Sequence, residues 1–139
     1  MYSTFENKAD IGVRGKGTSL NTAFSECAKA MTSIMASLKK IAPKKKIVLE
    51  VKASDTQALL VAFLNELLFI KDAKQMIFSK FEVAVEADEH GAQLKAICFG
   101  EKINSKRHEL MTEVKAATYS QLKVAKKGKE WVAQCIVDV

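Results

Sequence analysis

The sequence predicts an α+β fold in which two helices pack against antiparallel β-sheet. Apolar residues recur at helical spacing in two segments of the first half, 18–38 and 54–73. Alternating apolar and polar residues fill most of the second half, and short polar turns separate them. This order is typical of an α+β domain, and a chain of 139 residues is expected to form a single domain over residues 1–139.

Each predicted helix has a residue suited to cap its start. Thr18 or Ser19 can cap the first helix, and Ser54 or Asp55 can cap the second, because their side-chain oxygens accept hydrogen bonds from free backbone N–H groups. One face of each helix is apolar and is expected to be buried. These faces comprise Leu20, Phe24, Cys27, Met31, Ile34, Met35 and Leu38 in the first helix, and Leu59, Leu60, Phe63, Leu64, Leu67 and Leu68 in the second.

The predicted strands are short and mostly half-buried. The last of them is apolar on both faces, which favours a central position in its sheet. The segment 104–110 reads as a polar connection with room for one helical turn. The strands are expected at 10–14, 46–53, 81–87, 92–101, 112–124 and 130–139, with turns at 88–91 and 125–129.

Enzyme motifs are not evident in the sequence. The glycines of "GVRGKG" (12–17) lack the spacing of a phosphate-binding loop, and we interpret this stretch as a turn. His90 and His108 have no Ser or Cys partner in a recognisable motif and are interpreted as surface residues. The protein is therefore not expected to be an enzyme. The three scattered cysteines, Cys27, Cys98 and Cys135, are expected to be reduced core residues.

The chain is basic, with 22 Lys and Arg against 16 Asp and Glu, a formal charge of +6. Lysines cluster at 38–46 and 125–130, which we interpret as loops beside strands. They are either solvated loops or contacts for RNA phosphates, and no aromatic residues are interleaved with them. No apolar run is long enough to span a bilayer, and the N-terminus has no signal-peptide core, so a cytoplasmic protein without a membrane partner is expected.

Acidic groups near the two ends of the sequence suggest a cation site. Asp10 begins the first predicted strand and Asp138 ends the last one, followed by Val139 with its carbonyl and terminal carboxylate. If these strands pair or pack end to end, the oxygen atoms converge, as Ca²⁺ or Mg²⁺ requires. A solvated chain end is the alternative. Two carboxylates are too few for a metal-dependent hydrolase, which makes that function the least favoured.

The stretch "TEVKAATY" (112–119) is the second unusual feature. Its pattern places Glu113, Lys115 and Tyr119 on one strand face, with Ala117 between them. Such residues form either an ordinary cross-strand pair or a surface that a partner recognises.

The sequence resembles the archease family, the small protein activators of RtcB-type RNA ligases. The resemblance covers essentially the whole chain. It rests on "ADIG" with the helix after it, "LLVAFLNELLF", "GE" at 100–101, "EVKAATY" at 113–119, and the final "DV" after a tryptophan-containing strand. The resemblance implies a two-helix α+β fold, metal binding and a role in tRNA splicing.

The resemblance also implies residue roles and an indirect mechanism. The family's cation, usually taken as calcium, is bound by residues that correspond to Asp10, Asp138 and Val139. The partner ligase forms a guanylated histidine with GTP and manganese, and archease-like proteins promote that step and multiple turnover. The expected docking surface includes Glu113, Lys115 and Tyr119. The alternative is a basic RNA-binding or chaperone-like module that acts without a ligase.

The sequence departs from the family pattern near the expected cation site. Asn7 and Lys8 stand where the family usually has histidine and threonine, and Ser120 stands where it has a second histidine. The chain is also basic where many relatives are acidic. The loss of two imidazoles bears on metal affinity and metal choice, and the basic charge suggests a different partner surface or direct contact with RNA.

Overall fold

The structure is a computed structural model that describes residues 1–7 and 9–139. Lys8 lies outside the described residues. The strands are β1 (Tyr2–Asn7), β2 (Asp10–Gly17), β3 (Lys45–Ala53), β4 (Met76–Asp88), β5 (Gly91–Lys102), β6 (Ala116–Ala117), β7 (Lys123–Lys127) and β8 (Glu130–Asp138). The helices are α1 (Leu20–Met35), α2 (Thr56–Lys74) and the single turn α3 (Ser105–His108), with a 3₁₀ turn at Leu38–Lys40.

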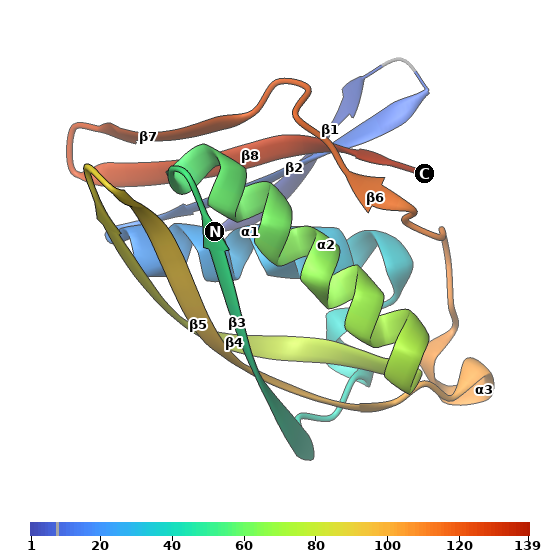
Figure 1. Cartoon of the computed structure of the whole chain (residues 1–139). Helices are drawn as coiled ribbons and strands as arrows, with labels where there is room; N and C mark the ends of the chain where they lie inside the picture. Colours follow the sequence, from blue (N-terminus) through green and yellow to red (C-terminus); the bar gives the residue numbers. More distant parts are fainter. Residues whose placement is uncertain (8) are drawn as a thin grey trace.

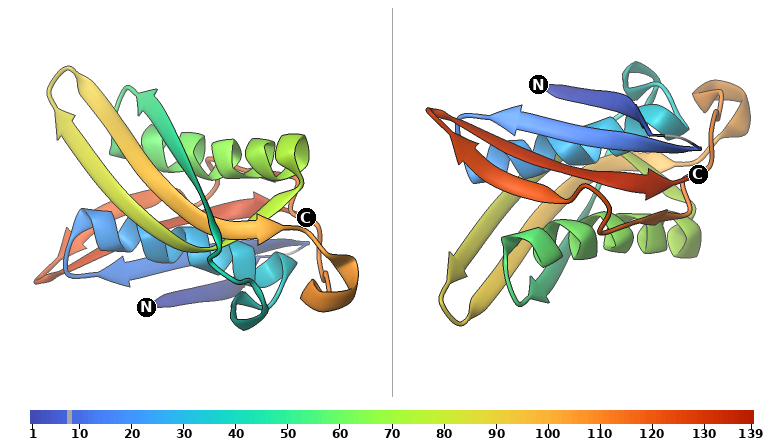
Figure 2. Two further views of the ribbon diagram at one scale, coloured as in Figure 1. Left: turned by 90° about the horizontal axis from the view of Figure 1, so that it is seen from below. Right: turned by 90° about the horizontal axis from the view of Figure 1, so that it is seen from above.

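Two antiparallel sheets enclose the two long helices, which confirms the predicted α+β class. The first sheet has the order β1-β2-β8-β6, with β7 also pairing with β8, and the second has the order β3-β5-β4. Figure 1 shows α1 and α2 between the sheets. In Figure 2 the second sheet lies in front of the helices when viewed from below, and from above the first sheet lies in front of α1, with α2 visible beside it.

The helix caps follow the predicted chemistry. The Ser19 side chain accepts a hydrogen bond from Thr22 N–H at the start of α1. The Asp55 side chain does the same for Ala58 N–H at the start of α2. All the predicted apolar residues of α2 are buried, and those of α1 are buried except Leu20, which packs against the core, and Leu38, which lies beyond the helix.

The prediction of a turn at 12–17 was wrong, because this glycine-rich segment lies within β2. The glycines of this segment allow neighbouring elements to pack closely against β2, and they do not reverse the direction of the chain. A Cβ atom built on Gly15 would lie 2.2 Å from Ala23 O and 2.2 Å from Cys27 N, both in the backbone of α1. Only a residue without a side chain lets the helix approach the strand this closely.

The prediction of one strand over 112–124 was also wrong. Only Ala116 and Ala117 pair as β6, and a separate strand, β7, begins at Lys123. Between them the chain bends, and Gln121 adopts the left-handed conformation with φ of 48°. The predicted turn at 125–129 is shorter than expected, since β7 continues to Lys127.

The central position predicted for the last strand is confirmed. Strand β8 pairs with β2 on one side and with β6 and β7 on the other. Five of its nine residues are buried, among them Cys135. Cys27 and Cys98 are also buried, and all three cysteines are free, as expected. Burial raises the pKa of the Cys98 and Cys135 thiols to about 12, which keeps them protonated and unreactive.

Candidate functional site

Asp10 and Asp138 are brought together by the pairing of β2 with β8. The antiparallel register joins Ile11 to Val137, so the next position on each strand sets Asp10 opposite Asp138. Residues directly opposite each other in such a pair project to the same face of the sheet. Asp10 is half-buried and Asp138 is exposed. The pairing on which the predicted cation site depends is therefore present.

Strand β6 brings a third segment to the same place. Ala116 pairs with Asp138, and Lys115 N–H donates a 2.8 Å hydrogen bond to the carbonyl oxygen of Asp138. Val139, the next residue, is half-buried. Figure 1 shows the C-terminus beside β6 and close to the end of the β1–β2 hairpin. Three distant parts of the sequence thus meet around two carboxylates.

Asn7 and Ser120, the two positions at which the resemblance leads us to expect histidine, lie on segments near this end of the sheet. Asn7 pairs with Asp10 across the β1–β2 hairpin. Its Oδ1 atom accepts a 2.8 Å hydrogen bond from Nε2 of Gln121, the residue that follows Ser120. Asn7 is therefore the cross-strand neighbour of Asp10, and the Ser120 carbonyl accepts a hydrogen bond from the N–H of Ile136, two residues before Asp138. The hydrogen bond between the two side-chain amides links the segment of Asn7 to the segment of Ser120 and Gln121.

The oxygen atoms of Asp10, Asp138 and the Val139 carbonyl supply only part of the ligands that a hard cation requires. Two carboxylates and backbone carbonyls are the oxygen ligands that Ca²⁺ and Mg²⁺ prefer, but Ca²⁺ takes about six to eight of them. Across residues 1–7 and 9–139, no three His, Cys, Asp or Glu side chains are close enough to hold a metal ion. A cation bound by Asp10, Asp138 and the Val139 carbonyl would therefore need additional oxygen ligands from water or from a partner.

Glu113, Lys115 and Tyr119 do not share a strand face as predicted. Glu113 and Lys115 precede β6 and belong to no strand, and Tyr119 lies in the bend after it. Ala117, expected between them on the same face, is buried. All three side chains are exposed, and Tyr119 is 65% exposed. They therefore flank β6 on both sides instead of lining one strand.

The side chain of Asn65 on α2 holds β6 in position. Its Oδ1 atom accepts a 2.8 Å hydrogen bond from Ala117 N–H, and its Nδ2 atom donates a 3.2 Å bond to Ala117 O. This double hydrogen bond replaces a neighbouring strand at the free edge of β6. It also supplies a physical role for the asparagine of "LNELL", which the sequence identified only as part of a family motif.

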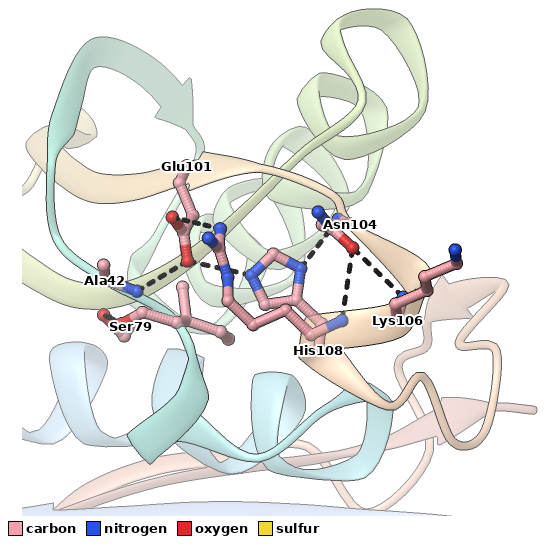
Figure 3. Close-up of polar contacts among 8 residues, drawn as sticks. Ala42, Ser79, Glu101, Asn104, Lys106 and His108 are labelled. Carbon is pink, nitrogen blue, oxygen red and sulfur yellow. Dashed lines mark hydrogen bonds and ion pairs between the residues drawn. The ribbon is translucent and has the colours of Figure 1, made fainter.

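A buried polar network joins β5, α3 and the segment before β3, as Figure 3 shows. The Glu101 carboxylate accepts hydrogen bonds from His108 Nε2 at 2.8 Å, Ala42 N–H at 2.8 Å and Arg107 Nη2 at 2.6 Å. The bond from His108 and the one from Ala42 hold the pKa of Glu101 below its usual value, with a smaller effect of Arg107. Glu101 is thus an ionised carboxylate with its hydrogen-bonding capacity used internally.

The prediction that His108 is a surface residue was wrong, because its side chain is completely buried. Its Nδ1 atom accepts a 2.9 Å hydrogen bond from Asn104 N–H, so the ring proton resides on Nε2, which donates to Glu101. Sequence reasoning missed this network because its residues lie in a polar segment. The one available signal was the pair of "GE" and a histidine seven positions later. His90, by contrast, is exposed as predicted.

Comparisons with known proteins agree with this architecture. The family model described as "Archease protein family (MTH1598/TM1083)" matches residues 2–139. The chain belongs to the archease family. A protein named archease from Pyrococcus abyssi is 40% identical over 99% of this chain and 98% of its own length. The archease of Thermococcus kodakarensis shows the same identity and coverage.

Solved structures support the fold of this archease-family chain. The solution structure of protein 1598 from Methanobacterium thermoautotrophicum is 28% identical, covers 99% of this chain and 98% of that one, and gives a TM-score of 0.84. The crystal structure of an archease from Thermotoga maritima, described as a possible chaperone, is 17% identical with a TM-score of 0.53, and shows the fold alone. Among the described residues of this chain, no helix is long and apolar enough to cross a membrane.

Proposed function

We propose that this archease-family protein activates an RtcB-type RNA ligase, and that the surface formed by β2, β6 and the end of β8 docks on the ligase. The observation that carries the proposal is the register that sets Asp10 opposite Asp138. The backbone N–H of Lys115 donates a hydrogen bond to the Asp138 carbonyl at the same place. Two carboxylates at the rim of a sheet, flanked by exposed polar and aromatic side chains, suit contact with a metal-dependent partner.

The role of this surface is to position reacting groups of the ligase, and the ligase itself performs the chemical steps. Asp10, Asp138 and the Val139 carbonyl would hold a divalent cation, calcium by the family resemblance. The bound cation supplies positive charge that attracts phosphate or carboxylate oxygens. Glu113, Lys115 and Tyr119 supply charged and aromatic contacts to the ligase. Such contacts favour guanylation by ordering the ligase's own groups before reaction.

Multiple-turnover RNA ligation tests the proposal. A cognate RtcB-type ligase is assayed with GTP and manganese, alone and with the wild-type protein, Asp10→Ala, Asp138→Ala or Glu89→Ala. Glu89 is the matched control, because its exposed carboxylate lies in the β4–β5 hairpin and its loss changes the charge equally. The wild type and Glu89→Ala are expected to stimulate turnover, and the two aspartate variants are not. Stimulation that survives both aspartate substitutions would exclude this surface.

The cation is tested without the ligase. A ligand that binds only the folded state raises the midpoint of thermal unfolding. Calcium is therefore expected to raise the unfolding temperature of the wild type and of Glu89→Ala, but not of Asp138→Asn, which keeps the size of the side chain. An equal rise in the unfolding temperature of Asp138→Asn would show that Asp138 does not bind the cation. Magnesium titrated in parallel establishes the preference between the two ions.

A further inference from the structure

The outer face of the β3-β5-β4 sheet is a second surface without an assigned role. One face of this sheet packs on the helices, with Leu49, Leu94 and Cys98 buried. The opposite face is turned away from the helices, as Figure 2 shows in the view from below. Val48 on this outer face is 53% exposed. The sheet therefore presents a broad, partly apolar platform to solvent.

An aromatic ring lies between two lysines on this platform. Phe99 of β5 pairs with Lys46 of β3 on one side and with Lys80 of β4 on the other. Residues paired in this way project from the same face. Both lysines are exposed, Phe99 is half-buried, and the Lys80 Nζ atom lies 5.1 Å from the centre of the Phe99 ring. The sequence did not reveal this arrangement, because the three residues come from three separate strands.

Further positive charge gathers at the same end of the sheet. Lys44 and Lys45 precede Lys46 and are exposed. Two residues beyond Phe99, Glu101 binds Arg107, whose side chain remains 49% exposed. The Ala42 N–H bond to Glu101 and the 2.9 Å bond from Ser79 Oγ to Ile41 O fix the course of the segment that leads into these lysines. The buried network thus positions a basic surface.

Apart from Glu101, which is paired with Arg107, the acidic residues of this face lie on the side of Phe99 toward the β4–β5 turn. Glu82 pairs with Ile97, the next position toward the β4–β5 turn on the same face, and Glu50 lies 3.9 Å from Lys95 one step beyond it. The platform is consequently basic around Phe99 and mixed in charge toward the β4–β5 turn. Binding of a polyanion is therefore favoured only at the basic end of the platform, around Phe99.

We propose that this basic platform, defined by Lys46, Lys80, Phe99 and Arg107, binds single-stranded RNA. Lysine and arginine side chains neutralise phosphates, and an aromatic ring on an exposed sheet stacks on an unpaired base. Lys80 has a flexible side chain that can leave the Phe99 ring for an adjacent phosphate when a base stacks. Duplex RNA cannot use this ring, because its bases are already stacked on each other. The proposal concerns direct RNA contact and does not depend on ligase activation.

The test is a binding titration of a short fluorescent oligouridylate by fluorescence anisotropy at several salt concentrations, without ligase. Each lysine that contacts a phosphate contributes about 0.7 to the slope of log K against log salt. Lys46→Ala and Lys80→Ala are each expected to reduce that slope by about this amount. Phe99→Leu, which keeps an apolar side chain at this position but removes the aromatic ring, is expected to weaken binding roughly 10-fold with little change in slope.

Lys126→Ala is the matched control, since it removes one exposed charge from the other lysine cluster. It is expected to leave affinity and slope nearly unchanged. The proposal fails if the wild type does not bind, if Phe99→Leu binds as tightly as the wild type, or if Lys126→Ala acts like Lys46→Ala. Equal affinity for duplex RNA of the same length also contradicts it. Ligase stimulation by Phe99→Leu is measured separately, so loss of RNA binding and loss of activation are distinguished.

Discussion

His108 and Glu101 form a buried hydrogen bond of 2.8 Å between Nε2 of the imidazole and Oε2 of the carboxylate. Glu101 belongs to β5, and His108 ends the single helical turn α3. The same carboxylate oxygen also accepts the Ala42 N–H. One side chain therefore fixes α3 and the lysine-rich segment 42–46 to the end of the β3-β5-β4 sheet.

Glu101→Ala is expected to lower the free energy of unfolding by about 2–3 kcal/mol. The substitution leaves the buried His108 ring and the Ala42 N–H without partners, and hydrogen bonds to a charged group are worth about 1.5–3 kcal/mol. Urea unfolding followed by circular dichroism measures the loss. Lys40→Ala is the control, because the Lys40–Glu109 ion pair is exposed and contributes less than about 1 kcal/mol. Equal losses in the two variants would contradict the structural role of Glu101.

The same carboxylate makes stability depend on acid pH. Its pKa in the folded state is held below the ordinary value of 4.5, chiefly by the bond from His108. A depressed pKa contributes stability that is complete above the unfolded-state pKa and is lost as the pH falls through the folded-state pKa. The wild type is therefore expected to lose stability below about pH 4.5, and Glu101→Gln to lose less over the same interval. Parallel curves for the two proteins would exclude this contribution.

Asn65→Ala is expected to release β6 from α2. The substitution removes both hydrogen bonds to Ala117 and is expected to lower the free energy of unfolding by about 1–3 kcal/mol. Amide exchange at Ala117 should accelerate more than at Val124 of β7. Asn21→Ala is the control, since Asn21 accepts one bond, from the exposed Val85 N–H. Unchanged protection of Ala117 would show that β6 does not depend on Asn65.

Gly15→Ala is expected to lower the free energy of unfolding by about 3 kcal/mol. The new Cβ would overlap backbone atoms of α1, so strand and helix must separate. Gly128→Ala is the comparison. Gly128 has open space around its Cβ position and a φ of 64°, so its cost is backbone strain alone, about 1 kcal/mol. Thermal unfolding of both variants gives the difference, and a smaller effect at position 15 would contradict the close approach.

Local patterns in the sequence predicted those helices and strands whose buried residues recur at the regular spacing of a helix or a strand. The caps at Ser19 and Asp55 and the alternation of β3 and β5 are examples. The start of β4 was missed because Met76, Ile77 and Phe78 are all buried and do not alternate. The strand expected at 112–124 failed because its pairing depends on Asn65 and β8, which are distant in sequence.

The candidate site was predictable in outline and not in its surroundings. Two aspartates at strand ends suggested that Asp10 and Asp138 meet, and the observed register agrees with that expectation. The Asn7–Gln121 bond, the buried His108 and the Lys46–Phe99–Lys80 row each join residues by tertiary contact across different elements. Such contacts leave no local period in the sequence, so only the fold reveals them.

The pairing of β2 with β8 also constrains the order in which the chain can fold. The side chains of Arg14 and Gln134 are hydrogen-bonded although 120 positions separate them. Closing so long a loop is entropically costly, and pairings of this kind slow folding. During synthesis on the ribosome, the β1–β2 hairpin must keep an open edge until β8 emerges. The nascent chain is therefore exposed to edge-to-edge association for most of its synthesis.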